Sequence, residues 1–261
     1  MNYGKAAMKR RYHEIDNKPT KIRKKCGVIF WKIFVVCLIV VGIVGISTGV
    51  GAVKGILASA PDISEIDVIP TGYSTTVLAS DGSEIATLVA EGSNRQYVTL
   101  NEIPKDLQHA VVAIEDERFY EHNGIDLKGI ARALVTDIKA MDFSQGASTI
   151  TQQLIKNNVL TEQWANENEG KISKLEKMER QVQRKIQEMY IAVELEKKVD
   201  NKEWILENYL NSINLGSNTL GVQAAEQRYF GKDVSELTLS ECAVIAGITK
   251  NPAGYNPILH P

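Results

Sequence analysis

The sequence predicts a mostly α-helical domain with a small β element, preceded by one membrane-spanning helix. Three observations predict this class. The run 33–53 carries no charged side chain, a turn flanked by β-branched residues follows it, and from Pro104 apolar residues recur at helical spacing almost to the end of the chain. With 44% hydrophobic residues, 24% charged residues and three cysteines, the composition excludes a disordered, collagen-like or disulfide-stapled protein.

The uncharged run 33–53 is long enough to cross a membrane. At a rise of 1.5 Å per residue, a helix of this length covers about 31 Å, which matches a hydrocarbon core of roughly 30 Å. A cleaved signal peptide is the alternative, because Ala58-Ser59-Ala60 resembles a cleavage site. The apolar core of a signal peptide would be shorter and nearer the N-terminus. We therefore predict a single-pass anchor.

Charge is distributed unevenly on the two sides of this run. Residues 1–32 contain 10 of the 30 Lys and Arg residues but 2 of the 32 Asp and Glu residues, so this arm has a net charge of +8 and the rest of the chain −10. Because basic residues favour the cytoplasmic flank of a span, the N-terminus is predicted to be cytoplasmic and the following domain extracytoplasmic. The acidic body argues against nucleic-acid binding.

After the span the sequence predicts a linker at 54–73 and one domain at 74–261. Segments 75–79 and 84–90 flank the turn Ser80-Asp81-Gly82-Ser83 and predict a β-hairpin, with a third short strand at 95–100. Pro104 suits the first turn of a helix, with Asn101 upstream as its cap. Further helices are predicted at 126–140, 147–158, 170–198, 201–213, 218–230 and 238–248, and Cys242 in the last of them is expected in the core.

The predicted helix 170–198 has two distinct faces. One apolar stripe is expected to face the core, and it consists of Leu175, Met178, Val182, Ile186, Met189 and Val193. Arg184 and Glu188 lie about 160° from Ile186 and within about 40° of each other. Taken alone, they form an ion pair on a solvated face, worth roughly a few tenths of a kcal/mol.

Two segments concentrate polar side chains that could carry chemistry. Carboxylates at 115–117 end an apolar helix and lead to Gly124, which taken alone is a helix end with a glycine cap. The segment 146–157 is crowded with hydroxyl and amide groups at the start of a helix, where anions also bind. Taken alone, this segment is an ordinary Ser/Thr-capped helix.

Together these segments resemble the peptidoglycan glycosyltransferase family, which forms the glycan-polymerising domain of class A penicillin-binding proteins and the monofunctional transglycosylases. The resemblance covers about residues 74–261 and rests on five motifs in the family's order. They are Glu115-Asp116-x-x-Phe119-x-x-His122-x-Gly124, then Gly146-x-Ser148-Thr149-Ile150-Thr151-Gln152-Gln153-Leu154-x-Lys156-Asn157, then Arg184-Lys185-x-x-Glu188, then Lys202-x-x-Ile205-Leu206-Glu207-x-Tyr209-Leu210-Asn211, and Ala224-Ala225 with Tyr229-Phe230-Gly231-Lys232.

The resemblance implies a lysozyme-like helical domain that polymerises lipid II at the bacterial cell membrane. In this family the acceptor's 4-hydroxyl attacks the donor's anomeric carbon, and undecaprenyl diphosphate leaves. The resemblance implies catalytic roles for Glu115, as general base, and for Glu188. It implies substrate-binding roles for Asp116, Phe119, Arg132, Ser148, Thr149, Gln152, Gln153, Lys156, Asn157, Arg184 and Lys185.

The reaction also suggests partners and a cofactor. Expected partners are lipid II, the growing glycan chain, the cell membrane and a cell-wall synthesis complex, with no nucleic acid. No metal-ligand cluster is evident, and a divalent cation (Mg or Mn) at the diphosphate is the one candidate cofactor. The interval 158–183 is longer than the family pattern leads us to expect, so its basic residues receive no role. Candidate membrane-facing side chains are Met141, Phe143 and Trp164.

Two other functions compete with glycan synthesis. A lysozyme-like hydrolase also uses two carboxylates in a helical domain, but Lys156-Asn157 and the anchor favour a diphosphate-lipid donor. A non-catalytic membrane-tethered scaffold would not need both Glu115 and Glu188. Neither of the transpeptidase signatures, S-x-x-K and K-T-G, occurs in the sequence. We expect the chain to be a fragment of a bifunctional enzyme, with a monofunctional enzyme as the alternative.

Overall fold

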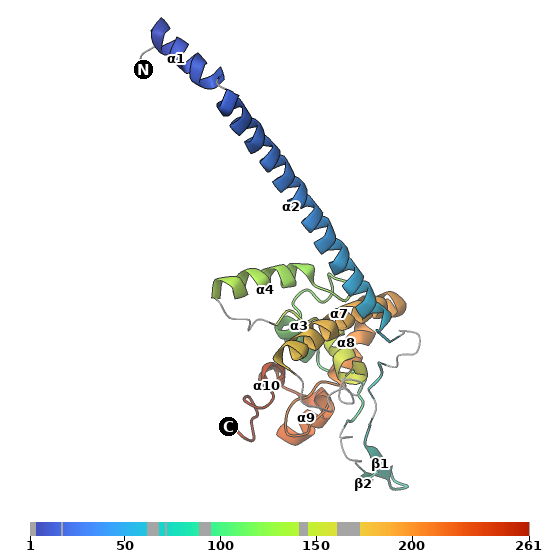
Figure 1. Cartoon of the computed structure of the whole chain (residues 1–261). Helices are drawn as coiled ribbons and strands as arrows, with labels where there is room; N and C mark the ends of the chain where they lie inside the picture. The colour runs from blue at the N-terminus through green and yellow to red at the C-terminus, as the bar shows by residue number, and fades with distance from the viewer. Residues whose placement is uncertain are drawn as a thin grey trace. The chain divides into compact units, whose positions relative to one another are not determined.

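The computed structural model describes residues 4–16, 18–61, 68–70, 72–88, 95–140, 146–160 and 173–260. The chain divides into two compact units, Met1–Ala58 and Ser59–Pro261. Helices dominate both units, and the strands of the described part form one small sheet (Figure 1). The mostly α fold class is therefore confirmed. The predicted membrane-facing residues Met141, Phe143 and Trp164 lie outside the described residues.

The first unit consists of α1 (Lys5–Asp16) and α2 (Lys18–Ala58). Within α2, Ile22–Ala58 is long and apolar enough to cross a membrane, with a mean hydropathy of 2.8 in its most apolar stretch and no part of that stretch buried. An uncovered apolar helix of this length is what a bilayer requires. Because α2 continues through Ala58, the first residues of the predicted linker are helical.

The second unit begins with the predicted hairpin. Strand β1 (Thr75–Leu78) pairs antiparallel with β2 (Glu84–Leu88), with an irregularity between Val77 and Leu78. The side chain of Asp81 accepts hydrogen bonds from the backbone and the hydroxyl of Ser83, which closes the turn.

The predicted third strand at 95–100 is wrong. Arg95 forms an isolated parallel bridge with Tyr73, and the described residues 96–100 are not in a strand. The backbone of Val98 pairs instead with the Asn211 side chain, which accepts from the Val98 nitrogen at 3.0 Å and donates to the Val98 oxygen at 2.8 Å. A buried amide side chain therefore takes the place of a neighbouring strand.

The helices of the second unit follow the predicted order with shifted ends. They are α3 (Lys105–Glu115), α4 (Leu127–Ala140), α5 (Ile150–Ile155), the π-helical turn η1 (Lys156–Leu160), α7 (Lys174–Val199), α8 (Lys202–Leu210), α9 (Val222–Tyr229), the 3₁₀ turn η2 (Val234–Glu236) and α10 (Leu239–Lys250). Pro104 itself is the N-cap of α3 and makes no side-chain capping bond, so the predicted Asn101 cap is wrong.

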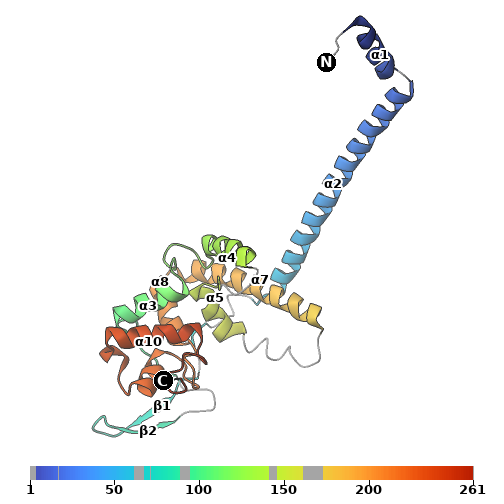
Figure 2. The ribbon, with the colours of Figure 1, turned by 90° about the vertical axis from the view of Figure 1, so that its left-hand side faces the viewer.

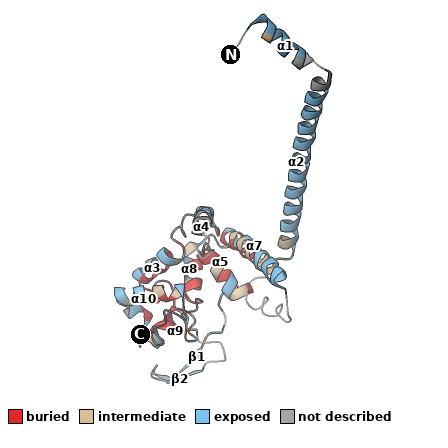
Figure 3. Cartoon of the chain, turned by 60° about the vertical axis from the view of Figure 1, so that its left-hand side comes forward, coloured by how far each residue is buried: buried red, intermediate tan, exposed pale blue. Residues whose placement is uncertain are grey.

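One hydrophobic core joins the helices of the second unit. Helix α10 packs against α3, and α5 packs against both α7 and α8 (Figure 2). Buried side chains from α3, α5, α7, α8 and α10 meet in this core, among them Leu107, Leu154, Ile191, Leu206 and Cys242. Figure 3 shows the buried residues gathered on the helices of this unit. The predicted core position of Cys242, which is 1% exposed, is confirmed.

The core-facing side of α7 differs from the predicted stripe. Leu175, Met178 and Val182 are exposed, whereas the buried residues of α7 are Gln187, Glu188, Ile191, Ala192, Leu195 and Glu196. The buried face mixes apolar and charged residues because its carboxylates have partners, on α7 itself for Glu188 and on neighbouring helices for Glu196. Glu196, for example, pairs with Lys202 of α8 at 2.7 Å and accepts a hydrogen bond from Thr151 of α5.

One carboxyl group lies in the interior without such a partner. Glu226 of α9 is 0% exposed, and within the described part of the chain neither of its side-chain oxygens has a hydrogen-bond partner. Burial, assisted by the nearby carboxylate of Glu241, raises the pKa of Glu226 to about 8. Glu241 is itself held ionised by Lys232, whose hydrogen bond is the main reason that its pKa falls to about 2. Glu226 is therefore mostly protonated at neutral pH.

Glu226 makes folding stability depend on pH. In the folded state its pKa is about 8 against an ordinary value of 4.5, so its contribution is fully present below pH 4.5 and is lost as the pH rises toward 8. Glu226→Gln cannot ionise and should flatten this part of the pH dependence. Melting temperatures of both proteins at pH 5 and pH 8 check this, because the wild type should lose more than the variant. Equal losses would contradict the assignment.

Candidate active site

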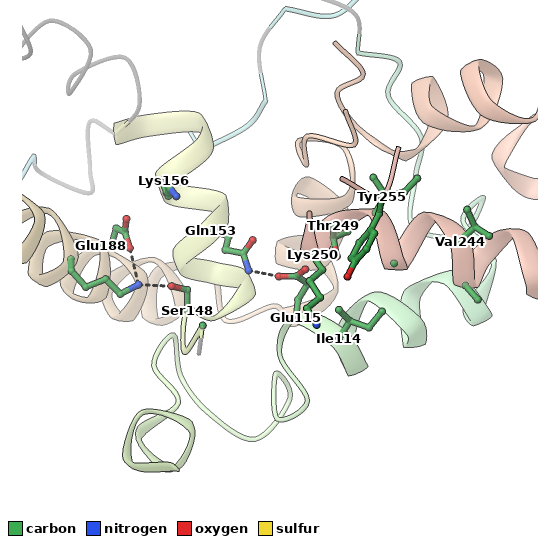
Figure 4. Close-up of a pocket in the computed structure, with 15 residues that line it drawn as sticks. Ile114, Glu115, Ser148, Gln153, Lys156, Glu188, Val244, Thr249, Lys250 and Tyr255 are labelled. Carbon is green, nitrogen blue, oxygen red and sulfur yellow. Dashed lines mark hydrogen bonds and ion pairs between the residues drawn. The ribbon is translucent and has the colours of Figure 1, made fainter. Parts of the chain in front are cut away.

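A pocket of about 1100 Å³ opens on the second unit (Figure 4). Its polar and charged lining comes from four segments that are far apart in the sequence. These residues are Glu115 at the end of α3, Ser148, Gln153 and Lys156 around α5, Lys185 and Glu188 of α7, and Thr249, Lys250 and Tyr255 at the end of α10 and beyond it. Fold and pocket therefore bring three of the five sequence motifs together.

The two carboxylates of the first motif point in different directions. Glu115 is the last residue of α3 and lines the pocket, where its Oε2 accepts a hydrogen bond from Gln153 Nε2 at 2.7 Å (Figure 4). Asp116 is buried, and its carboxylate accepts from the Ile150 backbone nitrogen at 3.0 Å and is bonded to His122 Nε2 at 2.9 Å. Asp116 thus fastens the end of α3 to the start of α5, and Glu115 is left facing the pocket.

Thr149 joins the second motif to the first. As the N-cap of α5, its hydroxyl accepts from the Gln152 backbone nitrogen and donates to the Gly124 oxygen at 2.8 Å. Gly124 has a φ of +83°, and a Cβ there would lie 2.6 Å from the Ala192 backbone, so only glycine fits this close approach. Thr149 and Gln152 are both buried, which makes them parts of the scaffold.

Lys185 is the centre of a polar cluster on the pocket wall. Its ammonium donates to Ser148 Oγ at 2.6 Å, to Gln152 Oε1 at 2.9 Å and to Glu188 Oε2 at 3.0 Å. The Lys185 cluster is defined here as these four residues. The Glu188 side chain is 9% exposed, so the interpretation of Arg184 and Glu188 as a pair on a solvated face is wrong for Glu188.

Other predicted site residues lie away from this pocket's lining. Phe119 is fully buried under the Lys202 ammonium, which lies 4.5 Å from its ring centre, and Arg184 is half-buried. Asn157 is exposed, and Arg132 is exposed with its guanidinium 3.4 Å from Glu117. Arg132 lines a smaller cavity of about 130 Å³, which shares Ile114, Glu115, Gly146 and Ser148 with the main pocket.

The sequence interpretation missed the contribution of α10. Thr249, Lys250 and Tyr255 line the pocket with Glu115, because α10 packs along α3 (Figure 4). The available signal was a lysine and a tyrosine around Asn-Pro-Ala-Gly directly after an apolar helix. Nothing local in that pattern indicates that the segment reaches a site more than 100 residues away in the sequence.

Charge in the pocket suits an anionic group. Its lining holds three lysines, Lys156, Lys185 and Lys250, and two glutamates, Glu115 and Glu188. Ammonium groups around such a pocket can stabilise negative charge on a bound group. Among the described residues, no group of three or more His, Cys, Asp or Glu side chains could hold a metal ion.

A comparison with known protein families decides the family. The model of the transglycosylase family matches residues 81–261 of this chain. The chain belongs to the transglycosylase family. The match includes all five motifs and every residue of the pocket lining, and it confirms the resemblance inferred from the sequence.

Several penicillin-binding proteins are similar to this transglycosylase. Penicillin-binding protein 1F of Bacillus subtilis is 44% identical over 188 residues, which cover 72% of this chain and 24% of that protein. Penicillin-binding protein 1A of Clostridium perfringens (strain 13) is 40% identical over 231 residues, covering 87% of this chain and 31% of that protein. Penicillin-binding protein 1A of Vibrio cholerae is 40% identical over 217 residues, covering 83% and 24%. The chain thus spans about a quarter to a third of these relatives.

Proposed function

We propose that this transglycosylase is a membrane-anchored peptidoglycan glycosyltransferase that polymerises lipid II into glycan strands. One observation carries the proposal. A carboxylate, Glu115, and the ammonium of Lys185 line the same pocket, and both are held by hydrogen bonds before any substrate arrives. Glycosyl transfer from a diphosphate donor requires such a pair, a proton acceptor and a cationic site for the leaving group.

Glu115 is the proposed general base. A sugar hydroxyl is a poor nucleophile at neutral pH, so its proton must pass to a nearby carboxylate as the bond forms. Gln153 holds Oε2 of Glu115 at 2.7 Å, and we assign the other oxygen to the acceptor's 4-hydroxyl. The acceptor oxygen bonds to the donor's anomeric carbon while the bond from that carbon to the diphosphate oxygen breaks. The proton ends on Glu115, and undecaprenyl diphosphate leaves.

The Lys185 cluster is the proposed site for the leaving diphosphate. Lys185 and Lys156 line the pocket and bring positive charge to it, and Arg184 precedes Lys185 on α7. Glu188 accepts a hydrogen bond from Lys185, and this bond fixes the ammonium in place. Lys250, on the opposite wall, is a further candidate for contact with the substrate. A Mg or Mn ion at the diphosphate stays a prediction.

The long apolar helix α2 suits lipid-linked substrates. Lipid II and the growing glycan both carry prenyl tails, so they are confined to the membrane. A domain tethered to that membrane meets them at a high effective concentration. We assign the catalytic domain to the outer side of the bacterial cell membrane and the N-terminus to the cytoplasm. Membership of a cell-wall synthesis complex belongs to the same proposal.

The proposed orientation predicts the outcome of reporter fusions. A reporter enzyme that is active only outside the cytoplasm should give signal when fused after residue 100 and none when fused before Lys21. The excess of basic residues ahead of the span is the reason for this expectation. Colony activity assays on both fusions measure it, with immunoblots to show that both are made. The opposite pattern would reverse the orientation.

Product analysis tests the proposed reaction against glycan hydrolysis. The purified 261-residue chain is incubated with lipid II in detergent, and separately with finished glycan strands. A glycosyltransferase consumes lipid II and produces glycan polymer, and it leaves finished strands unchanged. Shortening of finished strands without consumption of lipid II would support the hydrolase instead.

A further inference from the structure

The hydroxyl of Tyr209 is linked to Glu115, the proposed base, by two hydrogen bonds through one residue, Gln153. Tyr209 of α8 is 1% exposed, and its hydroxyl donates a hydrogen bond to Gln153 Oε1 at 3.1 Å. Gln153 in turn donates through Nε2 to Glu115 Oε2 at 2.7 Å. A buried hydroxyl requires a partner, and here that partner is the same amide that holds the pocket carboxylate.

The direction of this chain of hydrogen bonds is determined from the Glu115 end. An ionised carboxylate only accepts, so the NH₂ group of Gln153 must face Glu115 and its oxygen must face Tyr209. Burial, with the carboxylates Glu115 and Asp116 nearby, raises the pKa of Tyr209 well above its usual value, so the phenol keeps its proton and donates. A flipped amide would oppose its oxygen to the Glu115 carboxylate and lose that hydrogen bond, and its NH₂ group could then only donate to the Tyr209 hydroxyl.

The elements that carry the three residues are held in place independently of the substrate. Gln153 lies on α5, which Thr149 caps and which packs against α8. Asn201 caps α8, accepting from the Trp204 backbone nitrogen at 3.0 Å. Tyr209 therefore approaches Gln153 from a fixed direction, across the interface of two packed helices.

We infer that Tyr209 is a positioning residue, which fixes the amide of Gln153 so that its NH₂ group orients Glu115 in the pocket. This inference rests on the proposed function of Glu115 as the base. Tyr209 does not line the pocket, so it acts through Gln153 and does not touch the substrate. A conformationally restrained carboxylate reaches the acceptor proton more often than one that rotates freely.

The test is Tyr209→Phe, which removes only the hydroxyl. With the amide held by one hydrogen bond instead of two, the turnover number should fall by about tenfold at saturating lipid II, while KM stays within about twofold. The other charged pocket-lining side chains (Lys156, Lys185, Glu188 and Lys250) are unchanged in this variant.

Tyr229→Phe is the matched control. The Tyr229 hydroxyl donates to the Leu215 oxygen at 2.6 Å and lines no part of the pocket. The Tyr229→Phe variant should lower the melting temperature about as much as Tyr209→Phe, with a normal turnover number and a normal KM. If Tyr209→Phe behaves like this control, the Tyr209 hydroxyl is only structural and the inference is overturned.

A double variant isolates the path through Gln153. In Gln153→Met the Tyr209 hydroxyl has no amide to hold. Adding Tyr209→Phe to Gln153→Met should therefore lower turnover no further than Gln153→Met alone. If the losses of turnover from the two substitutions add up, Tyr209 does not act through Gln153. Glu115→Gln separates this inference from the proposed function. Activity in the Glu115→Gln variant would show that Glu115 is not the base, and the proposed function would then fail. If that variant is inactive while Tyr209→Phe turns over normally, only the role of Tyr209 fails.

Discussion

Glu115→Gln is expected to abolish glycan polymerisation in a protein that still folds. The amide keeps the shape of the side chain but cannot accept the acceptor's proton. The loss should reach at least the roughly 10²–10⁴-fold typical of a missing general base. Glu115 ends α3 at the pocket and is half-buried, so the fold should tolerate the change. Polymerisation rates with lipid II and thermal melts, measured on the same preparations, check both parts.

Glu236→Gln supplies the control for this substitution. Glu236 is an exposed carboxylate of η2 that does not line the pocket. The same chemical change there should leave both the rate and the melting temperature as in the wild type. A folded Glu115→Gln protein with a rate within threefold of the wild type would remove Glu115 from the role of base.

Lys185→Met should have the second largest effect. The substitution removes the ammonium that donates to Ser148, Gln152 and Glu188, and with it the cation assigned to the leaving diphosphate. Losing one such electrostatic contact typically lowers turnover by about 10²–10³-fold. Stability should fall as well, because the Glu188 carboxylate is 9% exposed and loses the donor Lys185. Turnover and melting temperature are measured together.

Two further variants separate the chemical effect from the structural one. Lys185→Met combined with Glu188→Gln removes the buried charge and should recover most of the melting temperature, but not the turnover. Lys197→Met breaks an exposed pair with Glu194 on the same helix and should change neither quantity appreciably. If the double variant regains turnover along with stability, Lys185 has no role at the diphosphate.

Local patterns predicted most of the fold. The uncharged run, the turn at Asp81 and the spacing of apolar residues each depend on neighbours within a few positions, and the helices and the hairpin appear where these patterns place them. The core-facing side of α7 was not predictable in the same way. The periodicity argument considers apolar residues and so does not predict that Glu188 and Glu196 are buried. Both are buried because Lys185 and Lys202 compensate their charges.

Only those residues of the candidate site that belong to the sequence motifs could be predicted from the sequence. Glu115, Gln153 and Lys185 come from three motifs and meet in one pocket, as the family resemblance implied. The adjacent Asp116 does not line the pocket, because the chain turns at the end of α3 and directs its carboxylate to the interior. Lys250 reaches the pocket only through the packing of α10 on α3, a long-range contact that no local pattern encodes.

In the proposed mechanism, Glu115 and the Lys185 cluster couple the formation of a glycosidic bond to the release of a lipid diphosphate. The most direct measurement counts both products of the purified chain acting on lipid II: new glycosidic bonds by glycan sizing, and free undecaprenyl diphosphate by chromatography. We expect one released diphosphate for each new bond, and neither product from Glu115→Gln. Release of the diphosphate together with free disaccharide, without any new glycosidic bond, would contradict the claim.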